Sequence, residues 1–343
     1  MTFAAEPGHI VDLSFTMLGA QNSVLHRAPW ADETDVSSTL TPVERNLSGD
    51  FFCAPFGASD VEEAPPHGWS ANGRWHPKET GAALAFELHR PVMGAKIKKR
   101  MHLSDVAPLF YQEHTIIGGE GALTVAHHPM VHCADGGRLS VSTKRLCVTP
   151  ERPLEPGRGA LAYPAESLDP ALFPGAEGPV DLTALPIGSG TEDFVTFVEA
   201  GQRKIGWTAV LRRAEDDIVF FLKDAHMLPV TMFWHSNGGR EYSPWNGRHV
   251  GVLGIEDGCA AGAAGHRAAL APNRIADTGV PTSLALRPDT AHRIAHVCGA
   301  LPRPEGWERV EDIDVQADQL IIQGTNGERV TLPFEAGFFE RNA

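Results

Sequence analysis

One segment of the chain, residues 226–260, combines a carboxylate with three candidates for ligand binding, Trp234, Arg240 and Trp245. The apolar run from Val250 to Ile255 predicts a short buried strand that ends at Glu256. Aromatic faces beside polar tips suit a polyhydroxylated ligand, whose C–H faces stack on rings while its hydroxyls need donors and acceptors. A carboxylate at the end of a buried strand can have its pKa tuned for proton transfer. The segment therefore predicts a sugar site with an acid–base residue; a solvated carboxylate is the alternative for Glu256 and the expectation for Asp257.

Two further segments carry histidine, the side chain best suited to donate or accept protons near neutral pH. The first, residues 65–75, reads PPHGWSANGRW and is a loop by its Gly and Pro content, with His67, Trp69 and Arg74 as candidates. Loops carry functional residues more often than the scaffold does. A capping loop whose tryptophans seal the edge of the core explains the same residues equally well.

The second segment, residues 111–132, predicts two strands around a Gly-rich turn and ends its second strand in His127-His128-Pro129. Adjacent histidines on a strand point to opposite faces, so at most one of them reaches a given pocket. Together with His132 they indicate a metal site as a further possibility to test, because transition metals favour imidazole ligands. The sequence has no HExxH, no cupin-like HxH with a spaced Glu, and no phosphate-binding or nucleophile-elbow motif. We therefore expect no metal and no cofactor, with metal catalysis as a minor alternative.

Composition limits the partners that such a site can serve. A net charge of −14 argues against broad nucleic-acid or anionic-membrane binding, which needs a basic surface. The concentrated basic run from Lys96 to Arg100 is expected on the solvated side of a strand. Five dispersed cysteines without a CxxC pair, and N-terminal residues without a secretory signal, favour reduced thiols in the cytoplasm. We expect a small-molecule carbohydrate as partner and no membrane; the oligomeric state is left open.

Alternating apolar and polar residues dominate the chain, and helical periodicity is scarce. The clearest predicted strands cover residues 10–17, 83–88, 194–198, 205–211 and 218–222. Residues 319–333 predict a hairpin around an Asn-Gly turn, and the best helix candidate is residues 287–299. Many short strands with Gly-rich turns predict an all-β sandwich or barrel with few short helices.

Residues 150–190 are rich in Pro, Gly and Ala and predict a long ordered excursion over the surface that covers part of a cleft. A flexible domain linker is the alternative. Docking is favoured by four apolar side chains in this excursion, Leu161, Tyr163, Leu172 and Phe173. We therefore expect residues 1–343 to form one domain with this excursion, because large β architectures reach such lengths as single units.

These motifs resemble, in order, those of the aldose 1-epimerase (galactose mutarotase-like) superfamily, and most closely its glucose-6-phosphate 1-epimerase-like branch. The resemblance covers roughly residues 10–300 through short motifs. The matching segments are Asn22–Leu25, the PFG-containing Gly49–Gly57, the loop His67–Trp75, the strand and turn Tyr111–Gly121, the element His128–Val131 and the late strand Val252–Glu256. The resemblance implies a large antiparallel β-supersandwich.

The resemblance also implies roles for individual residues. Glu256 resembles the base that takes the proton from the anomeric O1 hydroxyl, and His128 resembles the acid that protonates the ring oxygen. The ring then opens, the C1 carbonyl rotates, and closure from the other face gives the other anomer without a cofactor or metal. His67 and Arg74 resemble substrate-binding residues.

The sequence departs from the family pattern at two places. Met130-Val131 replaces the aromatic residue that usually follows the His-Pro pair, and the duplicated His127-His128 leaves the identity of the acid open. We add three stacking candidates of our own, Trp69, Trp234 and Trp245. The candidates for holding an anionic group on the sugar are Arg74, Arg240 and Arg248, since Arg suits phosphate and carboxylate equally well. A free sugar, a sugar phosphate and a sugar acid are all compatible with these residues.

Two alternatives to an epimerase stay open, because a fold does not determine a function. A non-catalytic sugar-binding protein would be favoured if His128 or Glu256 faced away from the cleft. Another sugar-active enzyme on the same scaffold, a lyase or a hydrolase, would be favoured by an extended groove or by a metal at the His127, His128 and His132 cluster.

Overall fold

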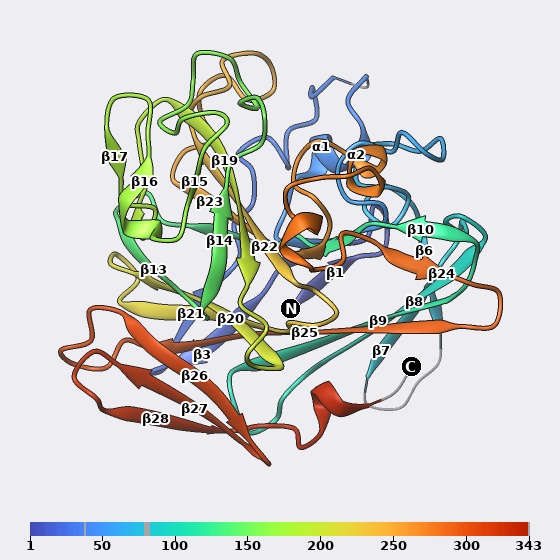
Figure 1. Cartoon of the computed structure of the whole chain (residues 1–343). Helices are drawn as coiled ribbons and strands as arrows, with labels where there is room; N and C mark the ends of the chain where they lie inside the picture. Colours follow the sequence, from blue (N-terminus) through green and yellow to red (C-terminus); the bar gives the residue numbers. More distant parts are fainter. Residues whose placement is uncertain (38, 79–82, 342–343) are drawn as a thin grey trace.

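Two large antiparallel sheets face each other in the computed structural model, which describes residues 1–37, 39–78 and 83–341 (Figure 1). Over this part of the chain the first sheet has ten strands: β1 (Thr2–Ala4), β2 (His9–Asp12), β5 (Asp50–Cys53), β11 (Val125–His127), β23 (Val252–Cys259), β22 (Val230–Asn237), β19 (Thr191–Glu199), β14 (Lys144–Val148) and β15 (Glu166–Ser167) in spatial order, with β12 (Met130–His132) also paired to β23. The all-β architecture expected from the alternating sequence is confirmed.

The second sheet has nine strands over the same described residues: β18 (Ala184–Leu185), β13 (Gly137–Val141), β20 (Ile205–Arg212), β21 (Asp217–Asp224), β25 (Ala291–Pro302), β9 (Leu109–Gly118), β8 (Ala95–Leu103), β7 (Leu84–Leu88) and β6 (Trp75–Lys78). Smaller sheets pair β3 (Ser14–Met17) with β4 (Ala20–Ser23), β10 (Gly121–Leu123) with β24 (Leu284–Leu286), and β16 (Phe173–Pro174) with β17 (Pro179–Val180). The helical elements are short: α1 (Pro42–Asn46), α2 (His266–Leu270), η1 (Pro170–Leu172), η2 (Ala276–Thr278) and η3 (Phe338–Glu340).

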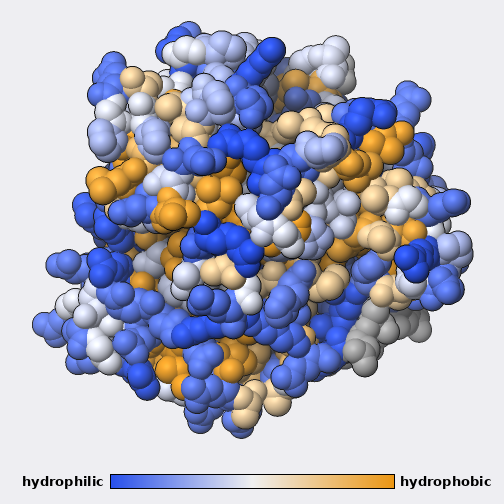
Figure 2. All heavy atoms as spheres, viewed as in Figure 1, coloured by the Kyte–Doolittle hydropathy of each residue, from blue (hydrophilic) through white to orange (hydrophobic). Residues whose placement is uncertain are grey.

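Inward-facing residues of the two sheets form the central core. Phe233 and Ile255 from the first sheet pack in one cluster with Val219 and Phe221 from the second. Burying each such side chain stabilises the fold by roughly 1.5–3 kcal/mol. The intervening residues of the first sheet point to its opposite, outer face, because successive side chains on a strand alternate. On the molecular face shown in Figure 2, hydrophobic residues are scattered among hydrophilic ones.

The interior between the sheets also holds a chain of paired charges. Lys223 on β21 is 1% exposed, and its Nζ lies 2.9 Å from Asp257 Oδ1 and 3.2 Å from Glu199 Oε1. Asp257 also contacts His296 Nε2 at 2.9 Å, and Glu199 pairs with Lys144. Asp257 is therefore a buried member of an ion network, and the expectation that it is solvated is wrong.

Two further expectations about local structure are corrected. Residues 287–299 are not helical: β25 spans Ala291–Pro302 and lies between β21 and β9 in the middle of the nine-stranded sheet. Its central residues are buried, so sheet packing on both sides overrides the weak capping signals. In the basic run on β8, Lys99 is buried beside Phe3 and Trp75 and donates to Gly8 O at 3.3 Å, while its neighbours Lys98 and Arg100 are exposed as expected.

The 319–333 hairpin is confirmed and belongs to a C-terminal three-stranded sheet. It pairs β27 (Gln319–Gly324) with β28 (Arg329–Pro333), and β26 (Val310–Gln316) lies on the other side of β27. In Figure 1 this sheet lies beside β20 and β21, and Leu320 and Ile322 pack with Phe220 of the nine-stranded sheet. The strands expected at residues 10–17, 83–88, 194–198, 205–211 and 218–222 are present as β2 and β3, β7, β19, β20 and β21.

The excursion at residues 150–190 contributes β15 to the ten-stranded sheet and β18 to the nine-stranded sheet, and it also forms hydrogen bonds with Asp193 on β19. The Asp193 carboxylate accepts hydrogen bonds from the Leu161 backbone amide and from the Tyr163 hydroxyl, both at 3.0 Å. Leu161 and Phe173 are buried in the central core cluster, whereas Leu172 is exposed.

Among the described residues, no helix is long and apolar enough to cross a bilayer.

Candidate active site

A cavity of about 290 Å³ opens on the outer face of the ten-stranded sheet. Its floor comes from β5, β23, β22 and β19, which contribute Phe51, Glu256, Trp234 and Phe194. Helix α1, the loop before β6 and the loop after β22 supply the rim. The lining residues are Val43, Glu44, Leu47, Phe51, Phe56, Gly57, Ala58, Pro66, His67, His128, Leu154, Phe194, Trp234, Arg240, Trp245, Glu256 and Ala263. Six sequence-predicted site residues therefore meet in one cavity: His67, His128, Trp234, Arg240, Trp245 and Glu256.

An imidazole and a carboxylate are paired in this cavity. His128 Nε2 lies 3.0 Å from Glu256 Oε1, and both side chains are almost fully buried. Strand pairing brings them together, because β11 and β12 both pair with β23 and His128 lies in the gap between them. Glu256 sits inside β23 rather than at the strand end that the sequence predicted. Glu256 Oε2 and His128 Nδ1 are both buried and make no hydrogen bond to another of the described residues.

Two residues of β5 hold His128 in place. The backbone amide of His128 donates to Asp50 Oδ1 at 3.0 Å, and the imidazole stacks on Phe51 with ring centroids 4.4 Å apart. Asp50 is itself fixed by Gln112, whose side-chain amide donates to Oδ2 at 2.6 Å. Asp50 was not predicted as a site residue, although it lies inside the PFG-containing segment Gly49–Gly57.

The electrostatics of the pair favour a protonated His128. Burial alone would lower the pKa of His128, but the negative charge of Glu256 and its hydrogen bond to the ring outweigh burial and raise the pKa. A raised pKa keeps the imidazolium to higher pH than in a free histidine, whose pKa is about 6.5. This pairing favours a His128 that can donate a proton to a group bound in the cavity.

We expect the pKa of His128 to depend on Glu256, and this can be measured directly. In the wild type, NMR titration should place the His128 pKa above that of a free histidine. Glu256→Gln should move it downward, because the stabilising charge is lost while burial, which disfavours the imidazolium, remains. A pKa that stays unchanged in Glu256→Gln would show that the carboxylate does not control His128. The exposed His226 serves as the internal reference.

His67 enters the cavity from a strained loop. Its φ of 65° is unusual for a residue with a side chain, and the following Gly68 is also left-handed with φ of 71°. The conformation is held by hydrogen bonds from the His67 amide to Gly57 O at 2.7 Å and from the Ala54 amide to His67 O at 3.3 Å. Such strain is often found at functional sites. Burial lowers the pKa of His67 to about 3, so this ring is neutral at ordinary pH.

Arg240 closes the other side of the cavity against aromatic rings. Its guanidinium lies 4.4 Å from the ring centroid of Trp245 and 5.4 Å from that of Trp234. Arg240 Nε is 3.0 Å from an oxygen of Glu192, which is fully buried and also accepts from Trp234 Nε1 at 2.5 Å. Burial raises the pKa of Glu192, although Arg240 and the hydrogen bonds oppose it. Glu192 was not predicted as a site residue; in the sequence it is a carboxylate just before the apolar run of β19.

Two predicted binding residues lie elsewhere. Arg74 is exposed just before β6, and Trp69 is half-buried with the guanidinium of Arg90 4.2 Å from its ring centroid. Neither contributes to the cavity wall. Their loop still serves the cavity, because it carries His67. Arg248, a third candidate for holding an anion, pairs instead with Glu33 outside the lining.

The histidine cluster does not have the geometry of a metal centre. His132 stacks against His26, away from the pair of His127 and Asp50. Within the described residues, donor atoms that could share an ion occur at Asp50, His127 and His296. The rings of His127 and His296 stack with centroids 4.2 Å apart and planes 12° apart. Their lone pairs lie in nearly parallel planes and do not converge on one point, so these residues fit an ion poorly.

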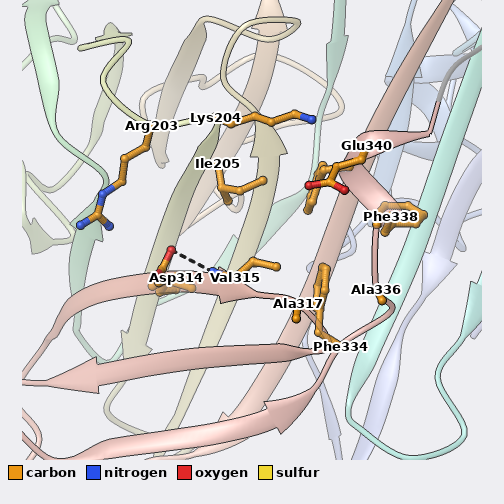
Figure 3. A pocket seen from close by; sticks show the side chains of 13 residues that line it. Arg203, Lys204, Ile205, Asp314, Val315, Ala317, Phe334, Ala336, Phe338 and Glu340 are labelled. Carbon is orange, nitrogen blue, oxygen red and sulfur yellow. Dashed lines mark hydrogen bonds between the residues drawn. The ribbon is translucent and has the colours of Figure 1, made fainter.

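A second cavity, of about 530 Å³, lies beside the C-terminal sheet (Figure 3). Ile205 and Phe334 contribute apolar surface to it, and Lys204 and Glu340 lie at its edge. None of the sequence-predicted site residues lines it. It also lacks a paired acid and base comparable to His128 and Glu256, as far as the described residues extend.

Comparison with solved structures identifies the architecture. The chain aligns with a provisionally assigned aldose 1-epimerase from Escherichia coli at 14% identity, covering 81% of this chain and 89% of that chain with a TM-score of 0.54. It aligns with a galactose mutarotase related enzyme from Lactobacillus acidophilus at 12% identity, covering 88% and 94%, with a TM-score of 0.55. The chain has the galactose mutarotase-like fold. The supersandwich implied by the sequence motifs is thereby confirmed.

The galactose mutarotase-like fold is not restricted to proteins named as epimerases. A TPR-domain containing protein from Parabacteroides distasonis also aligns, at 11% identity and a TM-score of 0.55, over 91% of this chain and 46% of that chain. No protein-family model matches the sequence, and no curated protein sequence matches it. The reaction must therefore be argued from the site itself.

Proposed function

We propose that the protein is a carbohydrate anomer epimerase, a mutarotase that interconverts the α and β forms of an aldose or aldose derivative. The observation that carries this proposal is the buried pair of His128 and Glu256, 3.0 Å apart in a cavity walled by aromatic rings. Small-molecule sites are typically concave, mostly apolar and equipped with a few convergent polar groups. The cavity volume of about 290 Å³ is at the lower end of such sites and suits one sugar ring.

In this mechanism the sugar takes over the hydrogen bonds that the pair makes internally. Glu256 removes the proton from the O1 hydroxyl while His128 gives its proton to the ring oxygen, so the C1–O5 bond breaks and C1 becomes an aldehyde carbon. Rotation about C1–C2 presents the other carbonyl face. The reverse transfers then close the ring: His128 regains its proton from O5, and Glu256 returns a proton to O1. Both groups end in their starting forms.

The remaining residues of the cavity bind and orient the sugar in this proposal. Trp234 and Trp245 contribute apolar surface, and Arg240 contributes donors. Arg240 already balances Glu192 and approaches Glu155 at 3.4 Å, so it is not a free cation awaiting an anionic group. We accordingly infer a small-molecule carbohydrate ligand whose identity experiment must decide, and we infer action in the cytoplasm from the unpaired cysteines.

A second candidate is an enzyme or binding protein for a longer carbohydrate. A neighbouring cavity of about 670 Å³ shares Leu154 and Ala263 with the candidate active site. The two together could hold more than one sugar unit. The lining of the larger cavity includes six polar or charged side chains, Thr149, Glu151, Arg152, Thr196, Asn273 and Arg274, but no histidine among the described residues, so the candidate acid–base pair lies in the smaller cavity. For this reason we place the monosaccharide reaction first.

The test is NMR exchange spectroscopy between α and β anomers, on a panel of aldoses, aldose 6-phosphates, sugar acids and reducing disaccharides. One sugar should exchange faster with catalytic amounts of protein. His128→Asn should remove the acceleration, and the surface variant His226→Asn should retain it. If no sugar exchanges faster while ligand-induced shifts persist, the protein binds without turning over. Acceleration restricted to disaccharides would favour the longer ligand.

A further inference from the structure

Cys53 makes a contact that the proposed chemistry does not yet use. Its Sγ lies 3.2 Å from His67 Nδ1, within the distance of a sulfur hydrogen bond. Cys53 ends strand β5, only two residues after Phe51, and is fully buried. His67 lines the cavity, and its ring stands at 85° to that of His128 with the centroids 5.4 Å apart. The thiol therefore lies directly behind a ring that faces the candidate acid.

The direction of this hydrogen bond follows from what each partner can do. A thiol offers one S–H donor, and a neutral imidazole offers one donor nitrogen and one acceptor nitrogen. Apart from His67 Nδ1, no acceptor for the Cys53 thiol is found among the described residues. If Nδ1 carried the imidazole proton, the buried thiol proton would have no acceptor, which is the less favourable of the two arrangements. The arrangement that satisfies both groups has S–H donating to an unprotonated Nδ1.

The protonation of both groups agrees with this direction. Burial raises the pKa of the Cys53 thiol well above its usual range, and the nearby carboxylates of Glu256 and Asp50 add to the effect. Burial lowers the pKa of His67 to about 3, and the charge of His128 acts in the same sense. A neutral thiol thus faces a neutral imidazole, and a thiolate–imidazolium pair is disfavoured.

We propose that Cys53 is a positioning residue that fixes the tautomer of His67, so that Nε2 carries the proton and donates it as a hydrogen bond to a sugar oxygen. With Nδ1 turned to Cys53, Nε2 is the nitrogen left for the cavity. A neutral imidazole that donates from a fixed nitrogen can stabilise developing charge on an oxygen without titrating near neutral pH. His67 is then a fixed donor, while His128 and Glu256 move the protons. The sugar part of this inference rests on the proposed function; the tautomer does not.

The tautomer can be measured without any substrate. In long-range ¹H–¹⁵N spectra of the wild type near neutral pH, we expect His67 to show an unprotonated Nδ1 and a protonated Nε2. Cys53→Ser should preserve this signature, because a hydroxyl also donates. Cys53→Ala should replace it with a mixture of tautomers. Finding Nδ1 protonated in the wild type would overturn the inference, and so would an unchanged signature in Cys53→Ala.

Activity supplies the second readout. Cys53→Ala should lower kcat for anomer exchange by about three- to tenfold, the scale of one neutral hydrogen bond, with a smaller change in KM. Cys53→Ser should restore most of the rate. The matched control is Cys147→Ala, a fully buried cysteine on β14 outside the cavity wall, which should leave both the His67 spectrum and kcat unchanged. Equal losses of kcat in Cys53→Ala and Cys147→Ala would show a general packing effect and would overturn the assignment. If the wild type exchanges no sugar, the proposed function fails, while the spectrum still decides the role of Cys53.

Discussion

Glu256→Gln should lower the rate of anomer exchange by about 10²- to 10⁴-fold, the usual contribution of a positioned general base. The amide keeps nearly the same shape but cannot accept the O1 proton. It also withdraws the charge that holds the His128 pKa up, so the acid partner is weakened in the same variant. The loss should appear in kcat more than in KM, because a ligand still meets the same cavity wall. Exchange spectroscopy on the sugar selected by the wild type measures both constants.

The matched comparison for this variant is Glu192→Gln. Glu192 is a buried carboxylate behind the cavity wall: it contacts the lining residues Arg240 and Trp234 and does not pair with His128. We expect it to affect KM through the placement of Arg240, with less effect on kcat. If Glu192→Gln reduced kcat as strongly as Glu256→Gln, the base would have been assigned to the wrong carboxylate.

Lys223→Met should reduce the free energy of unfolding by about 3 kcal/mol, because two buried carboxylates lose the counter-charge that they share and keep Lys144 and His296 as ion-pair partners. Lys223 is 1% exposed and bridges Asp257 and Glu199 between the two sheets. Chemical denaturation followed by far-UV circular dichroism and by tryptophan fluorescence measures the change. The exposed Lys96→Met, on β8, should change stability by no more than about 0.5 kcal/mol.

The ionisation of Asp257 also determines how the free energy of unfolding changes with pH. Burial would raise the Asp257 pKa, but Lys223 and His296 outweigh it and hold the pKa well below its usual range. The stability that this shift contributes is complete above the unfolded pKa, about 3.9, and is lost as pH falls toward the depressed native pKa. In Lys223→Met that protection should shrink, so unfolding by acid should begin at a higher pH. If the wild type already lost stability between pH 7 and pH 5, that loss would have to come from groups other than Asp257.

Much of the fold was predictable because alternation along a strand reports which face is buried. The hairpin at residues 319–333 carried its own turn signal, and β19, β20 and β21 were visible as apolar runs. The segment at residues 287–299 misled because it carries Pro and Gly at the positions of helix caps, while its burial between β21 and β9 depends on partners remote in sequence. Strand pairing between segments remote in sequence leaves no signal in the local residue pattern.

Site residues that belong to a recognisable sequence motif could be predicted. Residues whose role depends on a contact with a segment remote in sequence could not. The sequence pointed to His128 and Glu256 as separate residues, but only the joint pairing of β11 and β12 with β23 brings them within 3.0 Å. Lys99 and Asp257 look like solvent-facing charges until their buried partners are known. Asp50 and Cys53 act through neighbours, so their residue types alone gave no indication of a role.

The cavity is built from two kinds of structure, the central strands and the excursion at residues 150–190. Central strands fix His128 and Glu256, whereas Leu154 lines the rim and Glu155 reaches Arg240 from a segment that is anchored through Asp193. Loops tolerate change in length and sequence far better than the strands that they cover. Ligand choice can therefore change through the excursion alone, while the pair that we propose to transfer protons stays on the central strands.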